Sequence, residues 1–230
     1  SSKVNVEDRM MLAYTSGTTG HPKGVVHCHK PVRNTYERAM LLGHNRNDVH
    51  MSYLPLFHAY GFSEVAMMAG LTGGSQVLFD VFEADEVLEA VEVEGGTVLH
   101  GFDSHWADLI RSQQQNERDV SSLRVGTLPA GMESTIPIAR QAQDVFCPTT
   151  SGFGMSESWA FIASSHITDS LEQRTEASGY PMYGIEFEIR DLDTGTVLGA
   201  NETGALHVKG YTVTSGYWDK PEATAEVLDD

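Results

Sequence analysis

Residues 14–24 read Tyr14-Thr-Ser-Gly-Thr-Thr-Gly-His-Pro-Lys-Gly24, and this stretch decides how the rest of the chain is interpreted. Its three glycines allow the backbone to turn so that several N–H groups point at one anion. Its hydroxyl side chains add hydrogen-bond donors, and Lys23 adds a mobile positive charge. The stretch therefore predicts a loop that holds phosphate.

The residues on either side predict a strand before this loop and a helix after it. Arg9–Thr15 has the character of a strand, and an amphipathic stretch begins at Val25. Strand, glycine-rich loop and helix together are typical of phosphate sites in nucleotide enzymes. The loop is not a P-loop, because Lys23 is followed by Gly24 and not by Ser or Thr. Composition alone leaves open a flexible Gly/Ser/Thr connector.

Bulk composition excludes several classes of protein. The 230 residues, 40% of them hydrophobic, are enough for one large globular domain. A net charge of −17 argues against a nucleic-acid-coating surface, so a polyanionic ligand must be held by local groups. No apolar run approaches the ~18 residues that span a bilayer. We expect no nucleic-acid partner and no transmembrane segment.

The two cysteines, Cys28 and Cys147, form neither a disulfide framework nor a zinc-type spacing. The N-terminus has no secretory signal pattern. Both observations predict a cytoplasmic protein. His27-Cys28-His29 has no second ligand pair after it, so we expect structural or solvent-exposed roles there.

Short apolar strands alternate with helical stretches from residue 9 to about residue 150. This order predicts an α/β fold, a mostly parallel βαβ sheet with flanking helices. The expected strands are Met10–Thr15, Val49–Leu54, Gln76–Phe79, Thr97–Gly101, Leu123–Leu128 and Asp144–Pro148. The expected helices are Val32–Leu42, Phe62–Leu71, Ala84–Val93, Ser104–Gln114 and Ile136–Gln143. Ligands of such sheets bind at the carboxyl ends of the strands.

The pattern changes after about residue 175. Tyr183–Arg190 alternates with a period of two, Asp193–Gly195 is a turn signal, and Gly204–Gly210 has the character of another strand. We therefore expect an α/β part over residues 1–175, followed by an antiparallel β-rich segment of the same large domain over residues 176–230.

Three further segments accompany the loop: Leu54-Pro-Leu-Phe-His-Ala-Tyr-Gly61, Ser151-Gly-Phe-Gly-Met-Ser-Glu157, and Glu202–Gly210 followed by Gly216-Tyr-Trp-Asp-Lys-Pro-Glu-Ala-Thr224. In this order and spacing, from about residue 8 to residue 230, they resemble the AMP-forming acyl-CoA synthetases. That superfamily also includes adenylation domains and luciferases. The resemblance implies that a carboxylate attacks the α-phosphorus of ATP, and that the thiol of coenzyme A then displaces AMP from the acyl adenylate.

The resemblance also implies roles for particular residues. The phosphate loop matches Thr15, Ser16, Gly17, Thr18, Thr19, Gly20 and Lys23. Glu157 matches the acid that holds Mg²⁺ against the triphosphate, and a hard cation prefers oxygen ligands. The remaining nucleotide-binding positions are Gly131, Gly152, Phe153, Gly154, Met155 and Ser156. Phe153 would pack on adenine, a role for which a core aromatic side chain is the alternative.

His58 matches a residue at the mouth of the acyl pocket, and a structural or solvated histidine is the alternative. An apolar acyl pocket is compatible with Tyr60, Gly61, Met155, Trp159 and Phe161, and so is ordinary core packing. The apolar loops favour a fatty or aryl acid over acetate. The partners expected are thus a carboxylic acid, ATP and CoA.

The chain departs from the family pattern at two places. Ala205 stands where the family usually has Glu, and the family's ribose-binding Asp, hinge and C-terminal lysine domain would lie beyond Asp230. We expect the 230 residues alone to be inactive and to self-associate. Two other functions remain open: an adenylation unit that loads a carrier protein, and a non-catalytic nucleotide-binding module.

Overall fold

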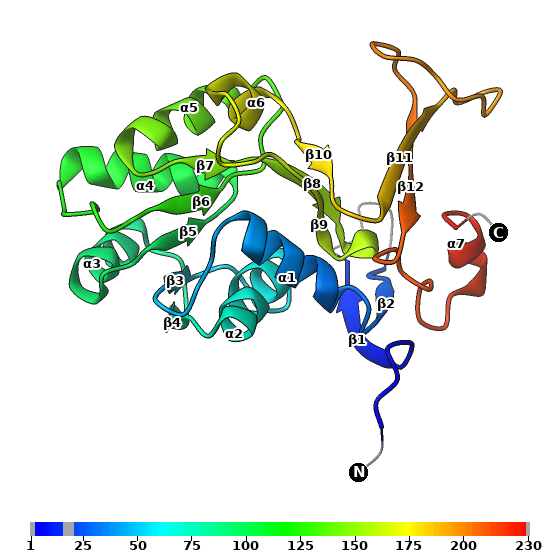
Figure 1. The fold of residues 1–230 in the computed structure, drawn as a ribbon, viewed down its shortest axis with the longest axis horizontal. Helices are drawn as coiled ribbons and strands as arrows, with labels where there is room; N and C mark the ends of the chain where they lie inside the picture. The colour runs from blue at the N-terminus through cyan, green and yellow to red at the C-terminus, as the bar shows by residue number, and fades with distance from the viewer. Residues whose placement is uncertain (1–2, 16–20, 229–230) are drawn as a thin grey trace.

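The centre of the molecule is a five-stranded parallel sheet in a computed structural model that describes residues 3–15 and 21–228 (Figure 1). The strand order is β4-β3-β5-β6-β7. The strands are β3 (Val49–Ser52), β4 (Ser75–Leu78), β5 (Val98–His100), β6 (Val125–Thr127) and β7 (Thr149–Thr150). All four pairings are parallel, which confirms the predicted α/β class.

Helices cover both faces of this sheet (Figure 1). One face carries α3 (Ala84–Glu94), α4 (Asp103–Gln115) and α5 (Ile136–Val145), and the other carries α1 (Val32–Leu41) and α2 (Met68–Thr72). Met51 and Leu99 pack against α3 and α4 in the main core. Val98 and Val125 point the other way and pack against α1 and α2. Alternate residues of each strand therefore serve opposite faces.

The helix expected over Phe62–Leu71 is present but begins earlier and is wider. Residues Tyr60–Met67 (η1) form a π-helix, and α2 continues from it. The π-helix begins within the last two residues of the segment Leu54–Gly61, one of the four that carry the family resemblance. Such π-turns occur frequently at functional sites.

The prediction of a helix directly after the glycine-rich loop is wrong. Residues Gly24–Cys28 form strand β2, which pairs antiparallel with β1 (Arg9–Tyr14) in register Ala13↔Val25. Val25 and Val26 are β-branched and buried, and they suit a strand paired on both sides. Strands β1 and β2 are therefore the two arms of a hairpin.

The prediction of a strand over Asp144–Pro148 is also wrong. Helix α5 continues to Val145, and β7 begins only at Thr149. The Gln143 side chain bonds both the backbone and the hydroxyl of Thr149, so the end of α5 is tied directly to this short strand.

The described strands outside the central sheet pair antiparallel, and those near the end of the chain confirm the predicted β-rich tail. Strands β11 (Ile185–Arg190) and β12 (Ala205–Gly210) form a projecting hairpin (Figure 1). A second sheet of order β10-β9-β8 begins earlier than expected, at Gly152. Its strands are β8 (Gly152–Met155), β9 (Ala160–Ser164) and β10 (Tyr180–Pro181). The remaining helices are the short turn η2 (Ser156–Ser158), α6 (Leu171–Glu176) and α7 (Pro221–Ala225). Across residues 3–15 and 21–228, none of the helices has the length and apolar character that a bilayer crossing requires.

Candidate functional site

Three segments far apart in the sequence meet at the side chain of Tyr217. Its hydroxyl donates a hydrogen bond to Glu157 Oε1 at 2.7 Å. Lys23 Nζ lies 4.8 Å from the centroid of the same phenol ring, a cation–π contact. The predicted metal-binding carboxylate and the lysine of the glycine-rich loop therefore lie on opposite parts of one buried tyrosine.

Backbone hydrogen bonds hold this arrangement in place. The segment 214–218 pairs with the free edge of β2, with Val26 N to Gly216 O at 3.0 Å and Trp218 N to Gly24 O at 2.7 Å. Thr214 N donates to the carbonyl of Glu157 at 2.7 Å. One short segment thus fixes both the hairpin that carries the loop and the turn that carries Glu157.

The base of the loop is closed by Thr15 and Lys23. Thr15 N donates to Lys23 O at 3.0 Å, and Lys23 N donates to Thr15 Oγ1 at 3.4 Å. Ser16, Gly17, Thr18, Thr19 and Gly20 lie outside the described residues. The loop leads into strand β2 and not into the N-terminus of a helix.

His27 fixes the turn around Glu157 to β2. Its ring is buried, and Nε2 lies 2.7 Å from the carbonyl of Ser156, so the proton is on Nε2. Burial lowers the pKa of His27, although the Ser156 carbonyl and Glu157 act in the opposite direction. The ring also packs edge-on against Trp159 at 5.1 Å. The imidazole is therefore neutral and structural at pH 7.

The turn that presents Glu157 is strained. Trp159 and Ala160 follow η2 with φ of 69° and 63°, both in the left-handed region. Such a conformation costs roughly 1–3 kcal/mol for a residue other than glycine. Trp159 is held there by burial and by a hydrogen bond from Nε1 to Thr35 Oγ1 at 2.9 Å. Packing thus enforces the backbone path that places the carboxylate.

The close approach of β9 to β8 explains why residues 152 and 154 are glycines, and no ligand is needed for that explanation. A Cβ on Gly154 would lie 1.3 Å from the carbonyl oxygen of Ala160, and one on Gly152 would lie 2.6 Å from that of Ala163. Between them, Phe153 is half-buried and packs edge-on against Phe187 at 6.4 Å. Met155, at the end of β8, is exposed.

Gly131 lies beside this hairpin. It has a φ of 110°, which a side chain would disfavour, in the turn after β6. Ser151 joins that turn to the start of β8, because its Oγ accepts from Ala130 N at 2.9 Å. The carboxyl ends of β6 and β7 therefore bring Gly131 close to residues 151–152.

His58 lies between β3 and η1, two residues before η1 begins, and is exposed. Its Nδ1 accepts from Tyr60 N at 3.1 Å, so in the neutral ring the proton is on Nε2. Loss of hydration lowers its pKa. The ring lies edge-on to Phe102 at 5.7 Å, and Phe102 in turn contacts Tyr60 at 5.1 Å. Among the described residues, His58 forms no hydrogen bond, ion pair or ring contact with Glu157 or Lys23.

The apolar residues considered for an acyl pocket are mostly core. Tyr60, Trp159 and Phe161 are buried, and the rings of Tyr60 and Phe161 meet edge-on at 4.9 Å. The Tyr60 hydroxyl donates to Thr127 O at 2.9 Å. Core packing accounts for these contacts.

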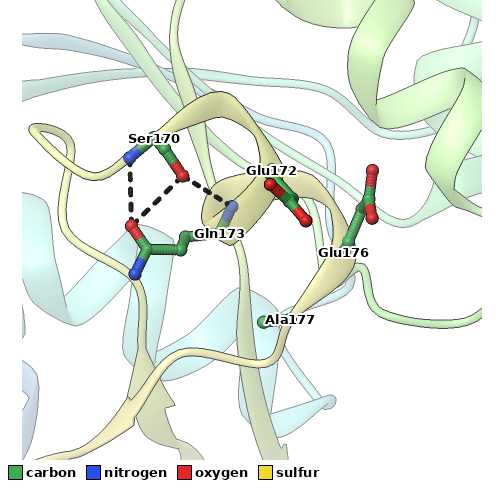
Figure 2. Close-up of a pocket in the computed structure, with 5 residues that line it drawn as sticks. All are labelled: Ser170, Glu172, Gln173, Glu176 and Ala177. Carbon is green, nitrogen blue, oxygen red and sulfur yellow. Dashed lines mark hydrogen bonds between the residues drawn. The ribbon is translucent and has the colours of Figure 1, made fainter.

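Two surface hollows accompany this region. One lies on α6 and contains none of the predicted site residues; Ser170 and Gln173 there form the cap of the helix (Figure 2). The other adjoins the site and is lined by Arg9, Val26, Ser215, Gly216, Tyr217, Trp218 and Asp219. Sequence reasoning gave no role to Thr214 and Tyr217, although Tyr217 belongs to a segment of the family pattern.

Comparison with known proteins shows the family of the chain. The model of the family described as AMP-binding enzyme matches residues 1–218. Acyl-CoA ligase sidI of Aspergillus fumigatus is 30% identical in an alignment that covers 99% of this chain and 39% of that protein. 4-Coumarate–CoA ligase 1 of Arabidopsis thaliana is 31% identical in an alignment that covers 100% of this chain and 42% of that protein.

Among solved structures, o-succinylbenzoate coenzyme A synthetase (MenE) from Bacillus subtilis, in complex with AMP, superimposes with a TM-score of 0.85 at 26% identity. The match covers 99% of this chain and 46% of that one. The chain spans about two fifths of the length of the curated relatives it matches. Since the family model matches nearly all of its residues, the chain belongs to the AMP-binding enzyme family.

Proposed function

We propose that the protein containing this chain is an ATP-dependent, AMP-forming acid–CoA ligase. It converts a carboxylic acid to an acyl adenylate with release of pyrophosphate, and then to an acyl-CoA thioester with release of AMP. The relatives named as CoA ligases support this reaction, and the AMP complex of the B. subtilis synthetase supports the nucleotide. The convergence of Lys23 and Glu157 on Tyr217 carries the proposal.

Charge stabilisation is the main task of such a site, because the leaving group is a polyphosphate. Thr15, Lys23 and the loop between them would hold the outer phosphates. Glu157 would hold Mg²⁺, which when bound neutralises charge on the phosphate oxygens. The Tyr217 hydroxyl orients the carboxylate for that role.

The other predicted residues complete the proposal. Phe153, Met155 and Ser156, with the glycines at 131, 152 and 154, would form the wall for the base and sugar, and His58 would stand at the entrance of the acid. We propose a fatty or aryl acid as the substrate and fatty acid metabolism as the setting. We also propose a cytoplasmic location, supported by the free thiols of Cys28 and Cys147.

ATP–pyrophosphate exchange on the full-length protein tests the reaction. The assay uses a panel of aliphatic acids of increasing length and of aryl acids. We expect acids of one of these classes to drive exchange. Mass spectrometry should then detect the CoA thioester of the acid that drives it. Exchange without a thioester would favour transfer to a carrier protein. ATP binding with no exchange for any acid would contradict the enzyme.

The variant Glu157→Gln tests the site. It removes the charge but keeps the shape, so we expect the exchange rate to fall by about 10²–10³-fold. Glu172→Gln is the matched control, because Glu172 is an exposed carboxylate on α6. Equal rates for the two variants would overturn the role of Glu157.

A further inference from the structure

Three histidines lie together inside the molecule, away from the site above. His44 follows α1, His50 is in β3 and His100 ends β5, and all three are buried, with at most 3% of each residue exposed. The ring centroid of His44 lies 5.0 Å from that of His50 and 5.8 Å from that of His100. The centroids of His50 and His100 are 6.3 Å apart. His50 pairs with Val98, so His50 and His100 share the sheet face under α1 and α2.

Most nitrogens of this cluster have no partner. His44 Nε2 and both ring nitrogens of His50 and of His100 form no hydrogen bond within the described part of the chain. Each unpaired buried polar atom costs about 1–3 kcal/mol. Five such atoms on three neighbouring rings are expensive unless something binds them.

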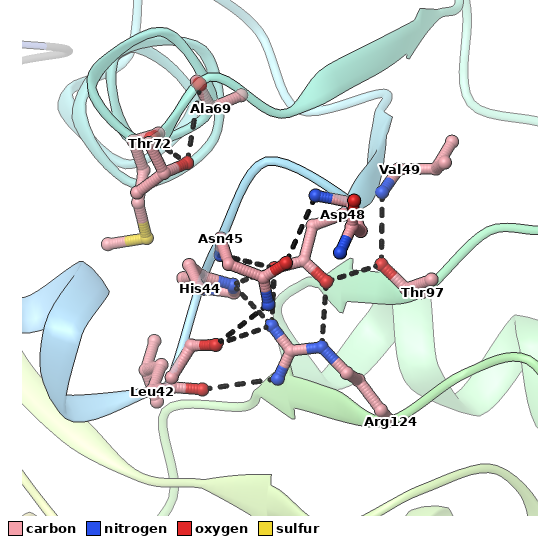
Figure 3. A network of polar contacts seen from close by, with 12 residues as sticks. Leu42, His44, Asn45, Asp48, Val49, Ala69, Thr72, Thr97 and Arg124 are labelled. Carbon is pink, nitrogen blue, oxygen red and sulfur yellow. Dashed lines mark hydrogen bonds and ion pairs between the residues drawn. The ribbon is translucent and has the colours of Figure 1, made fainter.

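An ion pair between Asp48 and Arg124 lies next to His44 (Figure 3). Asp48 accepts from Arg124 Nε at 2.7 Å, from Thr97 Oγ1 at 2.8 Å and from Asn45 N at 2.8 Å. Both of its oxygens are therefore engaged. Burial alone would raise the pKa of Asp48, but the hydrogen bonds from Arg124, Asn45 and Thr97 hold it well below its usual value. Asp48 stays ionised and balances the charge of Arg124.

The same ion pair orients His44. Asp48 Oδ2 lies 3.4 Å and Arg124 Nη2 3.2 Å from His44 Nδ1, so Nδ1 faces the ion pair. Binding of a metal ion through Nε2 requires the ring proton on Nδ1, where it is donated to Asp48. A carboxylate behind a histidine is the usual outer partner of a metal ligand. Potential ligand atoms of His44, Asp48 and His50 all lie within 4.8 Å of one another.

The imidazoles are in the form that metals require. Burial lowers the pKa of His44 to about 3 and that of His50 to about 4, so both are neutral at pH 7 and offer a lone pair. Burial also lowers the pKa of His100.

We propose that His44, His50 and His100 bind one divalent transition-metal ion such as Zn²⁺, with Asp48 as the outer partner of His44. Imidazole ligands suit Zn²⁺, Cu²⁺ and Ni²⁺ and not Mg²⁺, so this site is chemically distinct from the one at Glu157. Rings bound tetrahedrally at about 2.0 Å place their centroids about 5 Å apart. One pair already has this spacing, and the other two need to close by about 1 Å. The ion would tie the end of α1 to β3 and β5.

Metal binding by the full-length protein, freed of any histidine tag and stripped with a chelator, tests the proposal. The affinity for Zn²⁺ is measured by competition with a chromophoric chelator. Binding of Co²⁺ is followed by the visible absorption of the bound ion. Wild type should bind one equivalent more than His50→Leu, and its Tm should rise with Zn²⁺. The variant should bind Zn²⁺ at least about 100-fold more weakly at this site. His166→Asn, which removes an exposed histidine outside the cluster, is the control and should match wild type.

X-ray absorption on the zinc-loaded wild type gives a count of imidazole ligands that does not depend on any variant. Three imidazoles on one Zn²⁺, absent from His50→Leu, support the site. Equal metal content in wild type and His50→Leu, or a zinc environment without three imidazoles, would overturn it. If His50→Leu fails to fold, the imidazole count of the wild type decides alone.

Discussion

At Gly154 the backbones of β8 and β9 approach too closely for any side chain. A Cβ there would lie 1.3 Å from the carbonyl oxygen of Ala160, so Gly154→Ala must separate the strands on either side of Glu157. We expect the free energy of unfolding in urea to fall by more than about 3 kcal/mol. Gly70→Ala is the control, because Gly70 lies in α2 with open space around it, and it should stabilise by about 0.5–1 kcal/mol. Similar effects of the two changes would show that β8 and β9 are not in such close contact.

His27 gives a prediction about pH. Burial lowers its pKa in the folded protein, so between that value and the unfolded value of about 6.5 only the unfolded state takes up the proton. Stability is therefore lost as the pH falls below about 6.5, by up to about 1.4 kcal/mol per pH unit from this residue.

The measurement is urea unfolding from pH 7.5 to pH 5 for wild type and His27→Gln. The other histidines contribute equally to both proteins and cancel in the difference. The variant should be less stable at pH 7.5 and should lose less stability on acidification. Parallel pH profiles would mean that His27 is protonated equally in both states.

Lys23 and Glu157 could be singled out from the sequence, whereas their shared partner could not. The two residues belong to short sequence segments, and the order and spacing of these segments along the chain resemble those of a known family. Tyr217 is 60 residues from Glu157 along the chain, and its role depends on how the segment 214–218 adds to β2. His44, His50 and His100 show the same limit, because only the register of β3 and β5 brings them together.

Among the elements, the sequence predicted long amphipathic helices well and short strands poorly. Val87, Leu88 and Val91 lie on one face of α3, as its pattern predicts. The two-residue strand β7 is too short to have a pattern. Gly24–Cys28 was misjudged because four of its five residues are buried, so it lacks the alternation of a strand with one face in solvent. The division at residue 175 stays a prediction.

The contact between α1 and η1 contains a buried ion pair. Arg38 and Glu64 are fully buried and bonded to each other, and Arg38 also donates to Thr127 Oγ1 at 3.0 Å. Burial raises the pKa of Glu64, although Arg38 opposes the shift. Arg38→Met should cost about 3–5 kcal/mol, because Glu64 is then left without its partner.

A double-mutant cycle in urea measures this interaction. Arg38→Met/Glu64→Met removes both charges, so it should recover most of the stability that Arg38→Met alone loses. Additive losses would contradict a coupled pair and would assign the effect to the packing of Arg38 over Phe161.

For the molecule as a whole, charge is the dominant feature. Acidic residues outnumber basic ones 32 to 15, and the net charge is −17. Several ion pairs use the available cations, such as Lys30 with Glu7 and Arg111 with Asp108. Exposed carboxylates such as Glu86 and Glu94, at the two ends of α3, repel one another and the rest of the surface.

Salt should therefore stabilise this chain. Raising KCl from 0.1 M to 1 M shortens the screening length from about 10 Å to about 3 Å, which weakens repulsion between distant carboxylates more than it weakens contact ion pairs. A gain of about 1–2 kcal/mol would raise Tm by roughly 2–8 °C for a chain of this size. Thermal unfolding followed by circular dichroism measures the shift, and NaCl should act like KCl because screening depends on ionic strength. A Tm that falls with salt would mean that ion pairs, and not repulsion, dominate the surface, while a difference between the two salts would indicate bound potassium.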